Sequence, residues 1–341
     1  MKTNSTIKKI FAMLLACAMM LAFAACGSSP APAASEDPAD DDGTIKVAII
    51  KQLDHASLDE IANAIAARFD EMNAAGDVKV EYSISSGQND QTILKQLCDQ
   101  AIADKVDVIV PIATTAAQVA TLSAEGTGVK VVYAAISDPA AANLTGIDYV
   151  TGTSDALNTS FILDMMFSQN PDIKKVGLLY SLSEPNSATP IADAKAYLDA
   201  KNIEYVEQTA NTNDEVVAAA SALIAADVDA IFTPTDNTIM AAELAIYEDL
   251  AKAGIPHYTG ADSFVRNGAF ATCGVNYTEL GRKTAELAVR AVSGEALQDF
   301  YLMDGGIITV NTDTAAMIGK QAEYSCFDSM GTVVEVSTTK D

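Results

Sequence analysis

The stretch Val106-Asp-Val-Ile-Val-Pro-Ile-Ala-Thr-Thr-Ala-Ala-Gln-Val-Ala120 is repeated in pattern by Val228-Asp-Ala-Ile-Phe-Thr-Pro-Thr-Asp-Asn-Thr-Ile-Met-Ala-Ala242. Each is a short apolar run, a turn rich in Thr or Pro, and an Ala-rich or apolar helix start. The two begin 122 residues apart, too far for a solenoid repeat and about right for a domain. Two similar α/β lobes would face each other across a cleft. The repeat therefore predicts a protein that closes on a small molecule.

Apolar runs of strand length alternate with amphipathic segments in both halves, which predicts parallel sheets covered by helices on both faces. The predicted strands are 45–50, 79–85, 106–112 and 129–136 in the first half, and 175–180, 204–208, 229–233 and 255–260 in the second. The predicted helices are 57–75, 90–103, 116–124, 188–201, 214–226, 237–253 and 279–292.

Three connections between the lobes are predicted, around residues 143–146, 268–276 and 305–310. A few loop residues at such crossings can absorb a hinge rotation. We expect a first lobe of residues 44–145 plus about 277–305, and a second lobe of residues 146–276 plus about 306–330.

The N-terminus has the pattern of a secretory signal over residues 1–25, with a basic start and an apolar run of about 16 residues. That run is shorter than the roughly 20 residues of a membrane-spanning helix. Ala24-Ala25-Cys26-Gly27 resembles a bacterial lipoprotein processing site, in which Cys26 is acylated; ordinary Ala-x-Ala cleavage is the alternative. Residues 26–43 are Ser, Pro, Ala and acidic residues, which predicts a disordered tether.

The composition is strongly acidic, with 46 Asp and Glu against 21 Lys and Arg and a formal net charge of −25. Phosphate backbones and anionic headgroups repel such a chain, so nucleic-acid binding is disfavoured, and membrane association is expected from a lipid instead. A solvated surface explains the acidity equally well. Cys98, Cys273 and Cys326 have no CxxC spacing and predict no disulfide framework.

Ligands of open parallel sheets sit beyond the carboxyl ends of the strands. Thr114, Thr115 and Ala116 open a helix there, and its free N–H groups suit a carboxylate. Asp236 and Asp262 follow other strands and suit a cation such as an ammonium. Together these groups fit a zwitterion such as an amino acid, although Thr and Asp at helix starts are also ordinary caps.

Catalytic patterns are not found in the sequence. The two histidines differ in setting, because His55 follows the first strand, where it is able to touch a ligand, and His257 lies inside a strand. No cluster has metal-ligand spacing, no phosphate-binding loop occurs, and no G-x-S-x-G turn occurs. We expect no enzyme activity, no cofactor and no metal.

A set of short motifs gives the chain a resemblance to a known family. They are Ser86-Gly87-Gln88, Ala113-Thr-Thr-Ala-Ala-Gln118, Ser137-Asp138-Pro139, Leu144-Thr145-Gly146, Val150-Thr-Gly-Thr-Ser-Asp155, Leu179-Tyr-Ser-Leu-Ser-Glu-Pro-Asn-Ser187, Asn276-Tyr277 and Leu280-Gly281. The chain resembles a type I solute-binding protein of a bacterial ABC importer, and is similar to the family that includes tryptophan- and other aromatic-amino-acid-binding lipoproteins. It departs from the family after Asp155, where Ala156-Leu157-Asn158 replaces a Pro-containing helix start.

The resemblance implies an α/β fold of two Rossmann-like lobes with parallel sheets, joined by a hinge of three crossings. It implies a ligand site with one side formed by Gln88, Thr114, Thr115, Ala116 and Ser154, and the other by Asn186, Asp236, Asp262 and Asn276. The implied partners are ABC permease subunits, with a monomeric protein anchored to the membrane by its lipid.

The sequence therefore predicts an extracytoplasmic, lipid-anchored protein that captures a small polar solute. We expect this solute to be an amino acid, with aromatic amino acids among the candidates. The absence of Trp weakly favours amino acids over sugars, since sugars commonly stack on Trp. Three alternatives stay open: a ligand-sensing subunit of a membrane receptor, binding of a nucleoside or sugar, and a surface enzyme.

Overall fold

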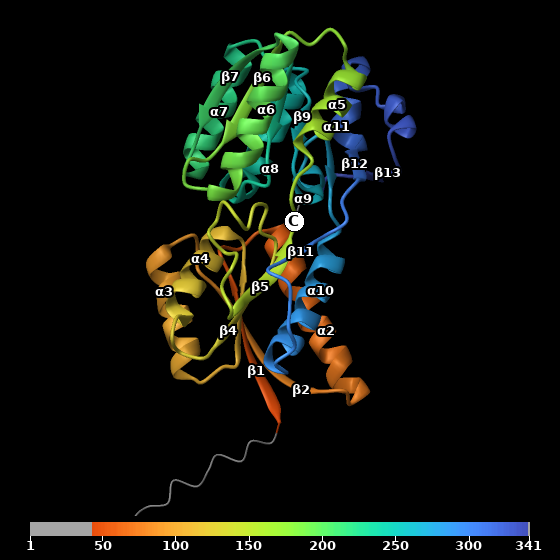
Figure 1. Cartoon of the computed structure of the whole chain (residues 1–341). Coiled ribbons are helices and arrows are strands. Elements are labelled where there is room, and N and C mark those ends of the chain that lie inside the picture. Colours follow the sequence, from red (N-terminus) through yellow and green to blue (C-terminus); the bar gives the residue numbers. More distant parts are fainter. Residues whose placement is uncertain (1–42, 340–341) are drawn as a thin grey trace, which may run out of the picture. The chain divides into compact units, whose positions relative to one another are not determined.

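The computed structural model describes residues 43–339, which form one compact unit with two sheets (Figure 1). The predicted signal, the tether and Cys26 lie outside the described residues. We call the part built on the sheet that begins at Thr44 the first lobe, and the part built on the other sheet the second lobe. Among residues 43–339, no helix is long and apolar enough to cross a membrane.

The first lobe has a six-stranded parallel sheet in the order β11-β5-β4-β3-β1-β2. Its strands are β1 (Thr44–Lys51), β2 (Lys79–Ser86), β3 (Val108–Ile112), β4 (Lys130–Tyr133), β5 (Val150–Ser154) and β11 (Tyr301–Leu302). Its helices are α2 (Ala56–Ala75), α3 (Gln91–Ala103), α4 (Thr114–Ala124) and α10 (Tyr277–Val292). Alternate residues of β1 and β3 are buried on opposite faces, against α2 and α10 or against α3 and α4, which explains the continuous apolar runs.

The second lobe has a seven-stranded sheet in the order β13-β12-β10-β9-β8-β6-β7. Its strands are β6 (Lys175–Tyr180), β7 (Glu204–Thr209), β8 (Ala230–Thr233), β9 (His257–Thr259), β10 (Ala271–Gly274), β12 (Ile307–Asn311) and β13 (Val333–Val336). Its helices are α5 (Thr159–Gln169), α6 (Ala188–Lys201), α7 (Asn213–Ala225), α8 (Asn237–Lys252), α9 (Asp262–Arg266) and α11 (Thr312–Ile318), with 3-10 turns at Pro185–Ser187, Gly319–Ala322 and Ser325–Ser329.

The predicted pair of α/β lobes with parallel sheets is confirmed, with one exception to parallel pairing. The segments predicted as extended connections at 268–276 and 305–310 contain β10 and β12, which pair antiparallel within the second sheet. Both strands lie next to segments that connect the two lobes, which explains why their sequences resemble linkers.

The first lobe extends past residue 145, because β5 pairs with β4 in the first sheet. The predicted boundary at 145/146 is therefore misplaced for this strand, and the chain crosses to the second lobe after Ser154. The strand was missed because Val-Thr-Gly-Thr-Ser is neither apolar nor long. Gly152 is required there, since a side chain would collide with the backbone and ring of Tyr133 in β4.

The chain returns to the first lobe after β10 and leaves it again after β11, so three segments connect the lobes. The returning helix α10 packs lengthwise on α2 (Figure 1). Gly281 permits this approach, because a Cβ there would lie 2.7 Å from both Ala64 Cβ and the Ile61 carbonyl oxygen. The predicted helix 279–292 thus completes the first lobe from a distant part of the sequence.

Candidate ligand-binding site

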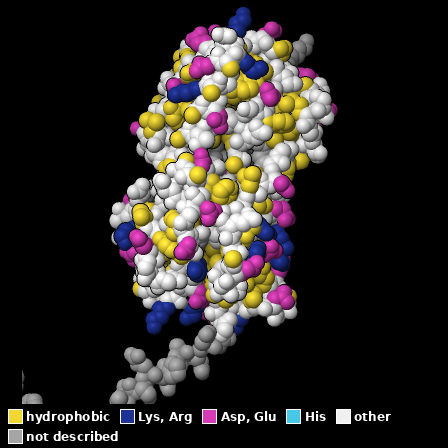
Figure 2. All heavy atoms as spheres, viewed as in Figure 1, with side chains coloured by type: hydrophobic (Ala, Val, Ile, Leu, Met, Phe, Trp, Pro, Cys, Tyr) yellow, Lys and Arg dark blue, Asp and Glu magenta, His cyan; other side chains and the backbone are white. Residues whose placement is uncertain are grey.

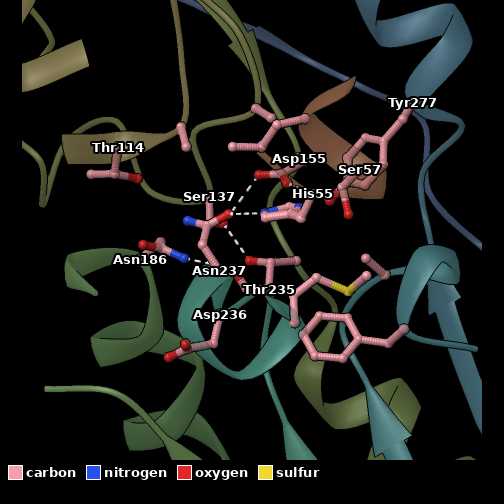
Figure 3. Close-up of a pocket in the computed structure, with 16 residues that line it drawn as sticks. His55, Ser57, Thr114, Ser137, Asp155, Asn186, Thr235, Asp236, Asn237 and Tyr277 are labelled. Atoms are coloured by element: carbon pink, nitrogen blue, oxygen red, sulfur yellow. Dashed lines mark hydrogen bonds between the residues drawn. The ribbon is translucent and has the colours of Figure 1, made fainter. Parts of the chain in front are cut away.

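The carboxyl ends of both sheets meet at a small cavity between the lobes (Figure 3). Its volume is about 20 Å³, room for roughly one water molecule. The lining residues are His55, Ser57, Leu58, Ala113, Thr114, Ala135, Ser137, Asp155, Asn186, Thr235, Asp236, Asn237, Met240, Ala261, Phe264 and Tyr277. Both halves of the repeat contribute, because the turns after β3 and β8 lie on opposite walls.

The start of α4 faces this cavity without a cap from its own N-cap residue. Ala113 precedes the helix with φ 79° and ψ 162° and makes no side-chain cap hydrogen bond, whereas the N–H of Thr115 donates to Gln52 Oε1 at 3.2 Å. Ala135, after β4, also has a positive φ of 58°. Such backbone is strained for alanine. The buried Thr114 Oγ1 has no hydrogen-bond partner, so donors are available at this wall.

Asp155 places a buried carboxylate on the same cavity, directly after β5. Its Oδ1 accepts a hydrogen bond from Ser137 Oγ at 3.0 Å, and its Oδ2 accepts one from Tyr277 Oη at 3.1 Å. Burial raises the pKa of Asp155, and the two hydroxyl donors oppose that rise. Both partners are neutral, so this carboxylate lacks the cation that normally accompanies a buried charge.

Asp236 also lines the cavity, but its carboxylate is fully engaged by its own lobe. Its Oδ1 accepts from the N–H groups of Thr238 and Ile239, and its Oδ2 accepts from Ser181 N and Ser187 Oγ, both at 2.7 Å. Burial raises the pKa of Asp236 to about 6, against these four donors. Asp236 is therefore the cap of α8, the alternative that the sequence left open.

Asn186 lies on the second-lobe wall and has one free acceptor. Its Nδ2 donates to the Thr235 carbonyl oxygen at 2.6 Å, whereas its buried Oδ1 has no partner. Figure 3 shows Asn186 beside Thr235 and across the cavity from Ser137 and Asp155. Asn186 Oδ1 and the Asp155 carboxylate are thus two acceptors on one cavity.

A chain of hydrogen bonds crosses between the lobes beside the cavity. Gln52 Oε1 accepts from Thr115 N at 3.2 Å, and Gln52 Nε2 donates to Glu184 Oε1 at 2.7 Å. Asn237 Nδ2 donates to Glu184 Oε2 at 2.6 Å, and Asn237 Oδ1 lies 3.0 Å from His55 Nε2. The other ring nitrogen of His55, Nδ1, is buried without a partner.

Burial shifts the titration of both ends of this chain. It raises the pKa of Glu184 to about 8, together with the nearby negative charge of Asp236. It lowers the pKa of His55, which keeps that imidazole neutral. The chain thus connects two buried titratable groups across the interlobe boundary.

The remaining wall is apolar, formed by Leu58 from α2, Met240 from α8 and Phe264 from α9. All three are nearly or fully buried. A ligand held at the polar groups would place its side chain against this wall. Among residues 43–339, no group of His, Cys, Asp and Glu has the arrangement of a metal site.

The predicted site residues divide into two groups in the structure. Thr114, Asn186 and Asp236 line the cavity, and Thr115 lies beside it through its bond to Gln52. Ala116 packs in the first-lobe core, and Ser154 lines a separate groove near the crossing. Gln88 and Asn276 are exposed; Asn276 caps α10 through Glu279 N.

Asp262 is likewise not brought to the cavity, because its Oδ2 pairs with Arg266 Nε at 3.1 Å within α9. Asp262 and Arg266 are four residues apart, the spacing of an ion pair within one helix. This spacing is visible in the sequence and indicates that Asp262 pairs with Arg266 and not with a ligand. The cavity is lined by Asp155, the residue that follows the predicted Ser154. Glu184 precedes the 3-10 turn Pro185–Ser187, and Asn237 is the first residue of α8.

Comparison with known proteins finds relatives that cover most of this chain. Residues 46–322 match the family described as ABC transporter substrate binding protein. A tyrosine-binding protein from Clostridioides difficile is 28% identical over 282 residues, which cover 81% of each chain.

Two solved structures are informative because each is 26% identical to this chain. An ABC domain in complex with L-Trp from Streptococcus pneumoniae has a TM-score of 0.77 and covers 85% of this chain and 100% of its own. The ligand-free, open structure of a substrate binding protein with adhesive properties from Clostridium difficile has a TM-score of 0.62 and covers 86% of this chain and 100% of its own.

Proposed function

The chain belongs to the ABC transporter substrate-binding protein family, and from this premise we propose that it captures an amino acid with an aromatic or large apolar side chain for import. Proteins of this family bind substrates outside the cytoplasm and are not enzymes. Of the three alternatives that the sequence left open, the surface enzyme is thereby removed. The relatives named for tyrosine and for L-Trp support an aromatic ligand.

One observation carries the proposal: a buried carboxylate without a cation and a helix start with an unpartnered hydroxyl lie on the same cavity. Asp155, joined by Asn186 Oδ1, would receive the ligand ammonium. Thr114 Oγ1, at the start of α4, would receive its carboxylate. The apolar wall around Phe264 would receive the side chain.

Entry of the ligand requires the lobes to part. The cavity of about 20 Å³ is far too small for an aromatic amino acid, since a cavity that admits benzene has about 150 Å³. The lobes are joined directly by the pairs Gln52–Glu184, His55–Asn237, Ser57–Ser263, Ser137–Thr235 and Asp138–Thr189.

The comparisons support lobe closure. At equal sequence identity, the TM-score is lower for the open, ligand-free structure than for the L-Trp complex. A different angle between the lobes would lower the TM-score in this way. Ligand contacts with both walls would shift the open–closed equilibrium towards closure, and the closed form would present its surface to the permease subunits.

The proposal places the protein at the outer face of the membrane as a monomer held by a lipid on Cys26. The large net negative charge supports an anchor of this kind, because anionic headgroups would repel the chain. Figure 2 shows Asp and Glu side chains spread over both lobes on the visible face, as expected for a solvated surface.

A thermal-shift screen of the twenty amino acids, nucleosides and common sugars tests the proposal. A ligand at roughly a thousand times its Kd should stabilise the protein by about 4 kcal/mol. We expect Tyr, Trp or Phe to give the largest shift. A response to sugars or nucleosides alone would refute the amino-acid assignment, and isothermal titration of each positive compound would supply its Kd.

A further inference from the structure

The hydrogen-bond chain from Glu184 to His55 fixes which ring nitrogen of His55 carries the hydrogen. Both Glu184 oxygens accept hydrogen bonds from amide groups, so Asn237 presents its Nδ2 to Glu184 and its Oδ1 to His55. His55 Nε2–H must then donate to that oxygen. Its Nδ1 is therefore a bare acceptor, buried and unpartnered at the cavity.

A proton on Glu184 would reverse this chain. A carboxylic acid needs an acceptor for its hydrogen, and Asn237 can offer its oxygen by turning its amide through half a circle. Asn237 Nδ2 would then donate to His55 Nε2. The imidazole would lose the hydrogen at Nε2 and gain one at Nδ1, so its charge stays the same and the net uptake is one proton from solvent.

We propose that Glu184, Asn237 and His55 form a relay in which a proton bound at Glu184 turns His55 Nδ1 into a hydrogen-bond donor for the ligand carboxylate. The donor would join Thr114 Oγ1 and the start of α4 on one cavity. Glu184 is a positioning residue in this relay, because it acts on the ligand only through Asn237 and His55. The inference rests on the proposed function, since it assumes a ligand with a carboxylate.

The relay is assembled only when the lobes close. Glu184 and Asn237 belong to the second lobe, whereas Gln52 and His55 follow β1 in the first. Opening would expose Glu184 to water and lower its pKa, because burial is the main cause of the rise. The closed form, in which the pKa of Glu184 is about 8, therefore holds the proton more tightly.

The charged groups around the relay act in known directions. Asp236, at the start of α8, is the charge that acts on Glu184, and it favours the protonated form. Near His55, Asp54 and Asp59 favour protonation of the ring, whereas Lys51 opposes it. Burial outweighs these charges and keeps the ring neutral.

Proton uptake gives ligand binding a defined pH dependence. The stabilisation of the closed form by the proton is complete at acid pH and is lost as the pH rises through about 8. Between the usual pKa of a glutamate and this raised pKa, affinity should fall by up to tenfold per pH unit, because one proton is bound with the ligand, and above the raised pKa it should level off. The amine of the ligand also titrates at high pH. Wild type and the variant described next are therefore compared with the same ligand, so that this contribution cancels.

The test uses Glu184→Gln, whose amide mimics the protonated acid by accepting from Gln52 and donating to Asn237. With L-tyrosine or L-tryptophan as the probe, we expect wild-type protein to take up close to one proton per ligand at pH 7, measured by calorimetry in buffers of different ionisation enthalpy. Glu184→Gln should take up almost none and should keep its affinity up to pH 9 relative to wild type. Asp138→Asn is the control, because Asp138 bridges the lobes through Thr189, outside the cavity and the relay, and the change should leave proton uptake unchanged.

A direct readout is the ¹⁵N spectrum of the histidine rings, which distinguishes the two tautomers. The chain has only two histidines, so a His257→Gln variant assigns the His55 signals. We expect Nδ1–H at pH 6.5 and Nε2–H at pH 9 in wild type, and Nδ1–H at both values in Glu184→Gln. A tautomer that does not change with pH, or the same change in Glu184→Gln, would overturn the relay. Failure of every amino acid to bind would instead refute the proposed function.

Discussion

Replacing Asp155 by Asn tests the proposed ammonium site most directly. The change keeps the size of the side chain and its place between Ser137 and Tyr277, and removes its charge. Asp155 is 5% exposed, so its attraction to an ammonium is little screened by water. A hydrogen bond to a charged group contributes about 1.5–3 kcal/mol, and loss of one partner of a buried charge pair costs about 3–5 kcal/mol. We therefore expect Asp155→Asn to weaken ligand binding by about 3 kcal/mol, which corresponds to an increase in Kd of about 150-fold.

The same number predicts the thermal-shift result. A ligand at a thousand times the wild-type Kd gives about 4.1 kcal/mol of stabilisation, and a 150-fold weaker ligand at the same concentration gives about 1.2 kcal/mol. The unliganded variant should be at least as stable as wild type, because it no longer buries a charge without a cation. A loss of binding with normal unliganded stability would therefore assign the effect to the site.

Asp262→Asn provides the matched control. Both acids follow strands in the structure, Asp155 after β5 and Asp262 after β9, but Asp262 pairs with Arg266 and does not line the cavity. We expect its Kd to stay within about twofold of wild type, as for an exposed ion pair. Isothermal titration of both variants with L-tyrosine or L-tryptophan measures the difference. Unchanged affinity in Asp155→Asn, or a large loss in Asp262→Asn, would refute the assignment of the ammonium site.

Three further predictions concern other parts of the molecule. Thr114→Val should weaken amino-acid binding by about 10- to 150-fold through loss of one hydrogen bond to a charged group, whereas Thr114→Ser should stay within a few-fold of wild type; equal Kd values for the two would remove the hydroxyl from the site. Gly281→Val should lower the free energy of unfolding by about 2–3 kcal/mol through overpacking against α2, measured by urea denaturation, and an unchanged midpoint would show that the α2–α10 contact tolerates a side chain. Cys26→Ser should release the protein from the membrane fraction in cell fractionation, and retention there would contradict lipid anchoring.

The two lobes were predictable because their signal is local. Strands such as Val108–Ile112 are buried on both faces and therefore read as apolar runs, and α2 and α10 repeat their apolar residues with helical spacing. The strand Val150–Ser154 escaped prediction because hydrogen bonding to β4 defines it, and its polar sequence does not. For the same reason, the first connection between the lobes lies after Ser154 and not at the predicted residues 143–146.

The candidate site was predictable only in part. Thr114 and Asn186 were found because they follow strands whose carboxyl ends meet at the cleft. Asp236 was found as well, but four hydrogen bonds within its own lobe make it a cap. Aspartate occurs both as a helix cap, at Asp236, and as a candidate ligand-binding carboxylate, at Asp155. Only the hydrogen-bond partners seen in the structure distinguish the two roles.

The sequence by itself determined that there are two α/β lobes and which loops face the space between them, because strand and helix patterns depend on residues near in the chain. Only the tertiary structure decided which side chains in those loops lack partners. Asp155, His55 and Glu184 acquire their roles from contacts with residues 18 to 182 positions away, such as Ser137, Asn237 and Gln52. Burial then sets their charge and hydrogen-bond state, and burial is a property of the packed lobes and not of any segment.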